Sequence, residues 1–138
     1  MEISKLTLKE LQPSQFYISE AKLSAVESWF DPCDLSGFEP IPVKILDGIP
    51  VMTDGHTRAA AALRAGLVSV PLIADPDDLD WDMYRECVWE CRNRGVNTPE
   101  DLLARIISET EYKEKWDAWC DEMQEAVLRK RAEQKISG

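Results

Sequence analysis

The sequence predicts an α+β fold, in which a small mixed sheet with packed helices is followed by an all-helical extension. Two short β-rich segments meet at Asp47-Gly48, a turn signal for a hairpin, and an alanine-rich helical segment follows them. The composition changes at the acidic residues 75–78, after which the apolar residues keep helical spacing. We therefore expect an α/β domain over residues 1–76 and a helical extension over 77–138, packed on that domain.

Turn signals and apolar spacing place the first elements. A short strand is expected over residues 6–8, where leucines alternate with polar residues. Ser19 is a suitable N-cap for a helix that continues to about Phe30. Asp31-Pro32 ends this helix, because the residue before a proline is disfavoured in the helical conformation.

The hairpin and the helix after it complete the predicted α/β unit. Its strands are expected over residues 41–46 and 49–53. The next helix begins after Gly55 and ends at Gly66, a typical C-terminal stop. A further strand is expected over residues 68–73.

The second half is predicted to be entirely helical from Asp80 onward. One helix ends at Gly95, and a second begins at Thr98, an N-cap followed by proline. A last helix covers about residues 110–135. The apolar positions of these three helices are Trp81, Tyr84, Val88 and Cys91; Leu102, Leu103, Ile106 and Ile107; and Tyr112, Trp116, Trp119, Cys120, Met123 and Val127.

Charge and hydropathy exclude several classes of function. The net charge is −10, and the arginines at 85–94 and 129–131 lie among acids, which argues against general nucleic-acid binding. No apolar stretch is long enough to span a membrane, and no apolar run of the signal-peptide type follows Met1. We therefore expect a cytoplasmic protein that binds neither DNA nor a membrane.

The four cysteines are Cys33, Cys87, Cys91 and Cys120. Their density is lower than in a secreted disulfide scaffold, so we interpret them mainly as free thiols. The spacing of Cys87 and Cys91 puts both on one side of a helix. A zinc site there would need two more ligands, and only His56 and the other cysteines are available.

The segment most suggestive of chemistry is 51–58, where a strand, a glycine turn and a helix start follow each other. Free N–H groups and the helix dipole favour an anion at such a place, and Gly55 permits close approach. His56 and Thr57 are expected to contact phosphate oxygens, and Arg58 to neutralise their charge. Asp54 is expected to orient Mg²⁺ or a substrate hydroxyl. A structural turn with a salt bridge is the alternative.

The stretch from about residue 6 to residue 75 resembles the ParB N-terminal/sulfiredoxin-like superfamily. Members bind nucleotide phosphates at the Gly-to-helix segment, which implies the same role here. The matching features are Leu11-Gln12-Pro13, Pro42-Val43, the hairpin, Asp54-Gly55-His56-Thr57-Arg58-Ala59, Gly66 and Val70-Pro71.

Within the superfamily, the Asp-Gly-His-x-Arg block is most similar to that of free-serine kinases. Sulfiredoxins place a catalytic cysteine where this chain has His56, so sulfiredoxin activity is not expected. Only Arg58 remains of the arginine-rich box of partitioning proteins. The serine kinases use an acidic residue after the strand-end proline as general base, but this chain has Gln15 there. Glu20 or Glu27 could substitute.

Two functions remain open from the sequence. In the first, the protein binds ATP, another nucleotide or a phosphorylated small molecule at Asp54–Arg58, together with Mg²⁺. It would then transfer a phosphoryl group to a small hydroxyl compound, with Asp54 and His56 as catalytic residues. The second is a non-catalytic nucleotide-sensing or partner-binding module, linked to DNA partitioning or a mobile element. The set Trp81, Trp89, Trp116 and Trp119 is interpreted as core or intersubunit packing, and a homodimer through the C-terminal helices is expected.

Overall fold

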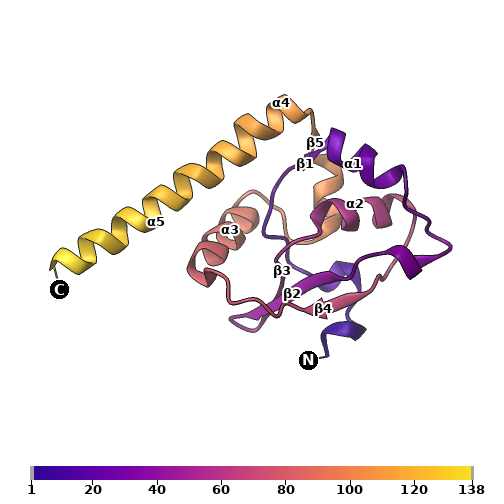
Figure 1. The fold of residues 1–138 in the computed structure, drawn as a ribbon, viewed down its shortest axis with the longest axis horizontal. Helices are drawn as coiled ribbons and strands as arrows, with labels where there is room; N and C mark the ends of the chain where they lie inside the picture. Colours follow the sequence, from indigo (N-terminus) through magenta and orange to yellow (C-terminus); the bar gives the residue numbers. More distant parts are fainter. Residues whose placement is uncertain (1, 138) are drawn as a thin grey trace.

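The computed structural model describes residues 2–137 and confirms the α+β class (Figure 1). In the described part, three strands form a mixed sheet in the order β3-β2-β4. β2 (Ile41–Leu46) pairs antiparallel with β3 (Ile49–Met52) and parallel with β4 (Leu72–Ala74). A second, smaller sheet is the parallel pair of β1 (Ile18–Ser19) and β5 (Ile106–Ile107).

The predicted hairpin is confirmed, and its turn uses the left-handed backbone region. Asp47 has a φ of 52° and Gly48 a φ of 79°. Positive φ at both turn residues matches the right-handed twist of the paired strands, which is why Asp-Gly is favoured there. The turn joins β2 to β3 and brings the end of β3 toward the start of the next helix.

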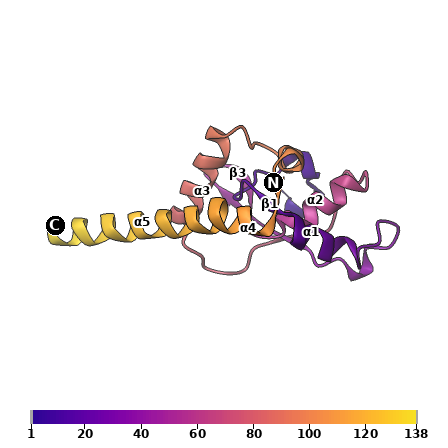
Figure 2. The ribbon, with the colours of Figure 1, turned by 90° about the horizontal axis from the view of Figure 1, so that it is seen from above.

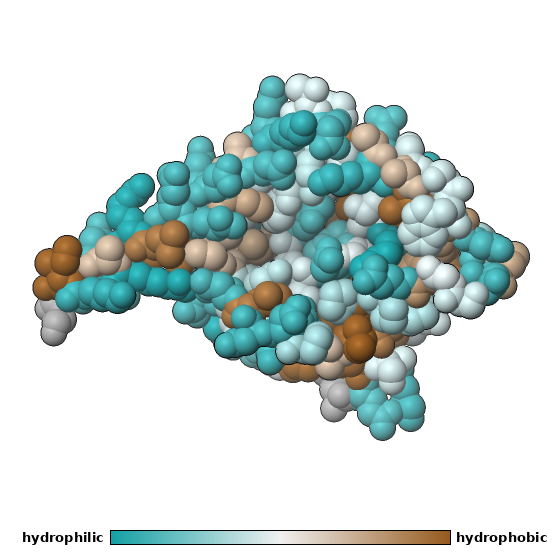
Figure 3. All heavy atoms as spheres, viewed as in Figure 1, coloured by the Kyte–Doolittle hydropathy of each residue, from teal (hydrophilic) through white to brown (hydrophobic). Residues whose placement is uncertain are grey.

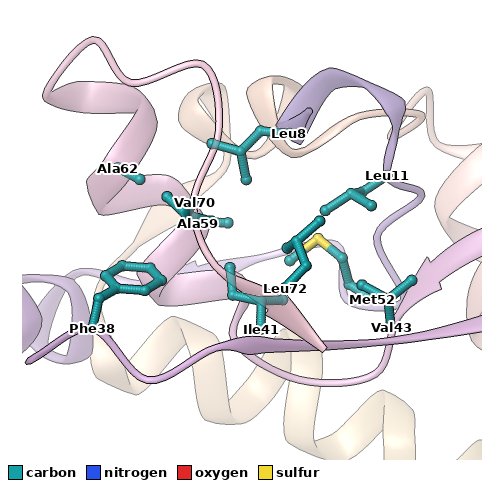
Figure 4. Packing of buried hydrophobic residues seen from close by; sticks show 10 residues of the cluster. All are labelled: Leu8, Leu11, Phe38, Ile41, Val43, Met52, Ala59, Ala62, Val70 and Leu72. Carbon is teal, nitrogen blue, oxygen red and sulfur yellow. The ribbon is translucent and has the colours of Figure 1, made fainter. Parts of the chain in front are cut away.

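Helix α2 (His56–Arg64) is the central element of the fold, because it is buried on two sides. Ala59 and Ala62 belong to a first apolar cluster, which also contains Leu8 and residues of the mixed sheet (Figure 4). Ala60 and Ala61 pack on the second cluster, with Phe16 and other residues from both halves of the chain. Small side chains let both clusters approach the helix closely, which explains its run of alanines.

The N-terminal strand prediction is wrong. Residues 2–11 instead contain two 3-10 helices, η1 (Ile3–Lys5) and η2 (Leu8–Glu10). The N–H of Thr7 donates to the carboxylate of Glu10 at 2.7 Å, a local hydrogen bond that stabilises the turn in place of a ladder. The N–H of Leu8 donates to the carbonyl of Val68.

The strand predicted over 68–73 begins later than expected, at Leu72. The carbonyl of Val68 is used by η2, and Pro71 has no N–H for a ladder. The carbonyl of Pro71 still accepts from the N–H of Ile41, so the pairing with β2 starts directly after the proline.

Helix α1 (Glu20–Glu27) starts where the sequence indicates and ends earlier. The N–H of Lys22 donates to Oγ of Ser19 at 3.3 Å, which confirms the predicted N-cap. The Ser19 hydroxyl also donates to the Glu109 carboxylate, so this cap links the start of α1 to the C-terminal half.

Helix α3 (Trp81–Asn93) agrees with the prediction, but the segment after it does not. Thr98 begins a 3-10 helix, η4 (Pro99–Ala104), and the chain then forms β5 against β1. The guanidinium of Arg105 donates to the Phe16 carbonyl at 2.5 Å, and the Arg105 carbonyl accepts from the N–H of Ile18. These bonds pull residues 106 and 107 into a ladder, so the second half is not entirely helical.

The chain ends in α4 (Glu109–Tyr112), a π-helical turn η5 (Lys113–Asp117) and α5 (Ala118–Ser137), which form one long rod (Figures 1 and 2). Trp116 and Trp119 stack on each other and meet the edge of Phe16, at 4.9 and 5.0 Å between ring centroids. Core packing is therefore confirmed for these two tryptophans. Trp89, in contrast, is 65% exposed.

The far end of α5 extends beyond the rest of the molecule, and apolar atoms gather there on a face that is otherwise largely hydrophilic (Figure 3). Leu128 and Ile136 are exposed. Among the described helices, none combines the length and apolar content that a membrane crossing requires. The division of the chain at residue 76 and the homodimer stay predictions, although the second apolar cluster draws residues from both sides of that division.

Candidate functional site

The start of α2 is built around Gly55, which has a φ of 80°. A Cβ at this position would lie 2.7 Å from Nη2 of Arg58 and 3.0 Å from Cγ1 of Ile41. Glycine is therefore required at this position for two reasons: it tolerates the left-handed backbone conformation, and it has no side chain to collide with Arg58 and Ile41. Nη2 of Arg58 therefore lies close to the N-terminus of the helix, where the first N–H groups have no partner within the helix itself.

The Arg58 side chain is mostly buried and partly neutralised. Only 13% of it is exposed, and its Nη1 lies 3.2 Å from the Glu39 carboxylate, which is 84% exposed. An ion pair with so exposed a carboxylate is weak. An incoming anion that also meets the helix N-terminus can therefore replace Glu39 as the partner of Arg58.

His56 is buried and forms part of the framework of the site. Burial lowers the pKa of His56 to about 4, so its imidazole is neutral at pH 7 and adds no positive charge. Its Nε2 accepts the backbone N–H of Ser14 at 3.0 Å, which assigns the proton to Nδ1. Every fully buried side-chain nitrogen or oxygen of the described residues has a hydrogen-bond partner. Because no partner is found for Nδ1 of His56, this atom is not fully buried. Nδ1–H is therefore open to the adjacent space.

The segment before Gln15 is held against β3. The N–H of Gln12 donates to the Pro50 carbonyl, the N–H of Met52 donates to the Gln12 carbonyl, and Oγ of Ser14 donates to the Met52 carbonyl at 2.6 Å. This pairing presents Gln15 beside the start of α2. The Gln15 amide then donates to the hydroxyl of Tyr112 at 3.0 Å, so residues from both halves of the chain meet here.

Two hollows adjoin this point. The first, of about 320 Å³, is called the cationic hollow, and its lining includes Lys22, Trp29, Gly55, Thr57, Arg58 and Tyr112. The second, of about 360 Å³, is called the aromatic hollow, and its lining includes Leu79, Asp80, Met83, Tyr84, Trp116 and Met123. Both are lined by Gln15, Asp54 and His56, which form a shared wall.

The two hollows differ in charge. The cationic hollow has two basic side chains, Lys22 and Arg58, and the ammonium of Lys22 lies 4.4 Å from the centroid of the Tyr112 ring. The aromatic hollow has no lysine or arginine among its described lining residues, and it has the carboxylates of Asp54 and Asp80. Asp80 accepts two hydrogen bonds from the Arg131 guanidinium, at 2.8 and 2.9 Å.

Asp54 is the carboxylate on the shared wall. It is exposed, and no ion pair or hydrogen bond of its side chain is found within the described residues. In the same part of the chain, no three His, Cys, Asp or Glu side chains are grouped closely enough to form a metal site by themselves. Mg²⁺ commonly takes one or two carboxylates together with phosphate oxygens and water, a donor set that the free Asp54 carboxylate fits.

The two alternative bases and the cysteines lie elsewhere. Neither Glu20 nor Glu27 lines either hollow, and Glu27 pairs with Arg64 at 3.3 Å. Cys87 and Cys120 line the aromatic hollow as free thiols, and burial raises the pKa of each to about 12. Such thiols are protonated at pH 7 and are not activated nucleophiles.

The structure therefore brings together all five residues of the predicted 54–58 site, together with residues that sequence reasoning missed. Gly55, Thr57 and Arg58 face the cationic hollow alone, whereas Asp54 and His56 line both hollows. The missed residues are Lys22, Trp29 and Tyr112 in one hollow and Tyr84, Trp116 and Met123 in the other. These residues are far from positions 54–58 in the sequence, so no short-range signal indicates that they line the hollows.

Comparison of the sequence with protein-family models and with curated proteins gives no match. Among solved structures, the chain matches the crystal structure of protein Atu1540 from Agrobacterium tumefaciens, with 14% sequence identity and a TM-score of 0.45. The alignment covers 79% of this chain and 63% of that protein, so the chain spans less than two thirds of its length.

Proposed function

We propose that the protein binds a nucleotide, with its phosphate groups in the cationic hollow. One observation carries this proposal: in a chain of net charge −10, Lys22, Arg58 and the N-terminus of α2 converge on one hollow. Free helix N–H groups and an arginine are strong ligands for phosphate oxygens. The resemblance of the 54–59 block to the ParB/sulfiredoxin-like superfamily supports the same assignment.

The base of the nucleotide has aromatic surfaces available in the same hollow. Trp29 is half-exposed and lines it, and Tyr112 forms another part of its wall. Aromatic rings bind nucleobases by stacking, which every base permits, so these residues support binding without selecting one nucleotide. The identity of the base is left to experiment, and ATP is the first candidate.

The chemistry that best fits the shared wall is phosphoryl transfer to a hydroxyl compound in the aromatic hollow. The Asp54 carboxylate accepts the hydroxyl proton while the hydroxyl oxygen forms a bond to the terminal phosphorus, and the nucleoside diphosphate leaves. In this reaction Asp54 acts as the base, and Mg²⁺ bound by the phosphate oxygens would neutralise their charge. Neutral His56 donates through Nδ1–H and orients a phosphate or hydroxyl oxygen.

A non-catalytic role is the second candidate, and Gln15 favours it. An amide cannot take a proton as a carboxylate does, and the Gln15 amide is engaged with the Tyr17 carbonyl and the Tyr112 hydroxyl. In that case the protein senses a nucleotide or binds a partner, in DNA partitioning or on a mobile element, and Asp54 serves only to hold Mg²⁺.

Calorimetric titration with ATP, ADP, CTP and GTP, each with and without Mg²⁺, tests the proposal. We expect nucleotide to bind and Arg58→Ala to weaken that binding at least tenfold, because a charge-assisted phosphate contact is lost. Arg64→Ala is the matched control, since Arg64 lies on the same helix and also has one ion pair with a glutamate. It should leave the affinity unchanged.

The outcomes separate the two candidates. If no nucleotide binds, or if both arginine variants lose affinity equally, the phosphate-site proposal is wrong. If a nucleotide binds and no hydroxyl compound is phosphorylated in its presence, the non-catalytic role is retained and the transfer reaction is rejected.

A further inference from the structure

The aromatic hollow has a lining that selects its occupant by polarity. Leu79, Met83 and Met123 supply apolar surface, and Tyr84 and Trp116 supply aromatic surface. The hydroxyl of Tyr84 donates to the Thr53 carbonyl at 3.1 Å, so this end of the ring is occupied. A volume of about 360 Å³ falls in the range of small-molecule sites, and such sites combine apolar walls with a few placed polar groups.

The charges around this hollow are unbalanced toward the negative. Asp80 is matched by Arg131, while Asp54 has no basic partner in the described structure. Asp75 is not among the lining residues and accepts a hydrogen bond from the hydroxyl of Thr53, which is, at 2.5 Å. With His56 neutral and no lysine or arginine in the described lining, the hollow carries one unpaired negative charge, that of Asp54 on the shared wall.

We propose that the aromatic hollow binds a positively charged amino alcohol with an apolar body, its hydroxyl and ammonium groups directed at Asp54, and that it rejects hydroxy acids. The inference rests on the proposed function in assigning this hollow to the acceptor. It adds the acceptor's chemical class. A carboxylate placed in this hollow would lose its water and meet Asp54 with no cation to offset the repulsion, so hydroxy acids are disfavoured.

Three probes with the same phenyl group test the proposal by calorimetry at pH 7: L-phenylalaninol, a cation; 3-phenylpropanol, which is neutral; and 3-phenyllactate, an anion. We expect L-phenylalaninol to bind at least tenfold tighter than 3-phenyllactate, with 3-phenylpropanol between them. The smaller amino alcohol L-alaninol is included in case the phenyl group is too large.

Variants locate the site. Asp54→Asn should weaken L-phenylalaninol at least fivefold and leave 3-phenylpropanol unchanged. Asp78→Asn is the control, since it removes the same charge from an exposed residue outside the hollow's lining and should change neither affinity. Met123→Trp, which fills the hollow, should reduce the binding of both compounds.

The proposal is overturned if 3-phenyllactate binds as tightly as L-phenylalaninol, if neither amino alcohol binds, or if Asp78→Asn has the effect expected of Asp54→Asn. Its failure is distinguishable from that of the proposed function. If Arg58→Ala loses nucleotide binding and still binds the amino alcohol, the variant affects only the cationic hollow and leaves the aromatic hollow intact. Nucleotide binding without amino-alcohol binding rejects only the acceptor class.

Discussion

Residues 54–58 divide into two groups with different environments. Gly55 and His56 are buried and hold the chain in place, whereas Asp54, Thr57 and Arg58 are more exposed and line the hollows. Arg58 has one weak ion pair, with Glu39. The first group contacts Ile41 and Ser14, and the second faces space that a ligand would occupy. The motif at residues 54–58, predicted as a single binding site, therefore contains a structural part, the framework, and a part that faces the ligand. Changes in the framework should alter stability, and changes in the other part should alter affinity.

Gly55→Ala is expected to have the largest effect on stability. It should lower the free energy of unfolding by about 2 to 3 kcal/mol, because it combines left-handed backbone strain with crowding against Arg58 and Ile41. Gly66→Ala is the matched control, since Gly66 has a φ of 84° and no atom within 4 Å of its Cβ position. Urea unfolding of both variants measures the difference, and equal losses would show that the close packing at Gly55 is unimportant.

His56 should make stability depend on pH. Its pKa is about 4 in the folded protein and 6.5 in the unfolded chain, so between these values the unfolded chain binds more protons. Stability therefore falls as the pH is lowered through this window. Between pH 7 and pH 5 we expect a loss of about 2 kcal/mol from this group. Urea unfolding of wild type and His56→Gln at both pH values measures it, and an equal loss in both proteins would contradict the assignment.

Arg58→Ala should have a small effect on stability compared with its effect on nucleotide affinity. Its ion-pair partner Glu39 is almost fully exposed, so loss of the pair should cost less than about 1 kcal/mol in unfolding free energy. Urea unfolding of Arg58→Ala, compared with Glu39→Gln, checks this. A loss above about 2 kcal/mol in Arg58→Ala would place Arg58 in the framework and would weaken its use as a ligand probe.

The features predicted correctly from the sequence are those with local causes. The Asp47-Gly48 turn and the Ser19 cap each depend on a few neighbouring residues, and so does the start of α2 at Gly55. The pairing of β1 with β5 was missed because its two strands are distant in the chain and each has only two residues. A local pattern assigned Ile106 and Ile107 to a helix, and a nonlocal ladder determined their conformation.

The site was predictable to a similar extent. The phosphate-binding segment has a local signal, whereas the position of Lys22 depends on how α1 packs against α2. The neutral state of His56 could not be predicted from the motif, because its burial depends on contacts with the segment around Ser14. Burial and pKa are properties of the folded chain, which a motif alone does not reveal.

The long C-terminal rod has a mechanical consequence. α5 has 20 residues, which at 1.5 Å per residue gives a length of about 30 Å. Its base is the π-helical turn that contains Trp116, a residue in the wall of the aromatic hollow. A rotation of about 10° at that turn would carry the far end of the rod by roughly 5 Å. The rod is thus a lever arm, whose tip would magnify small displacements at the wall of the hollow.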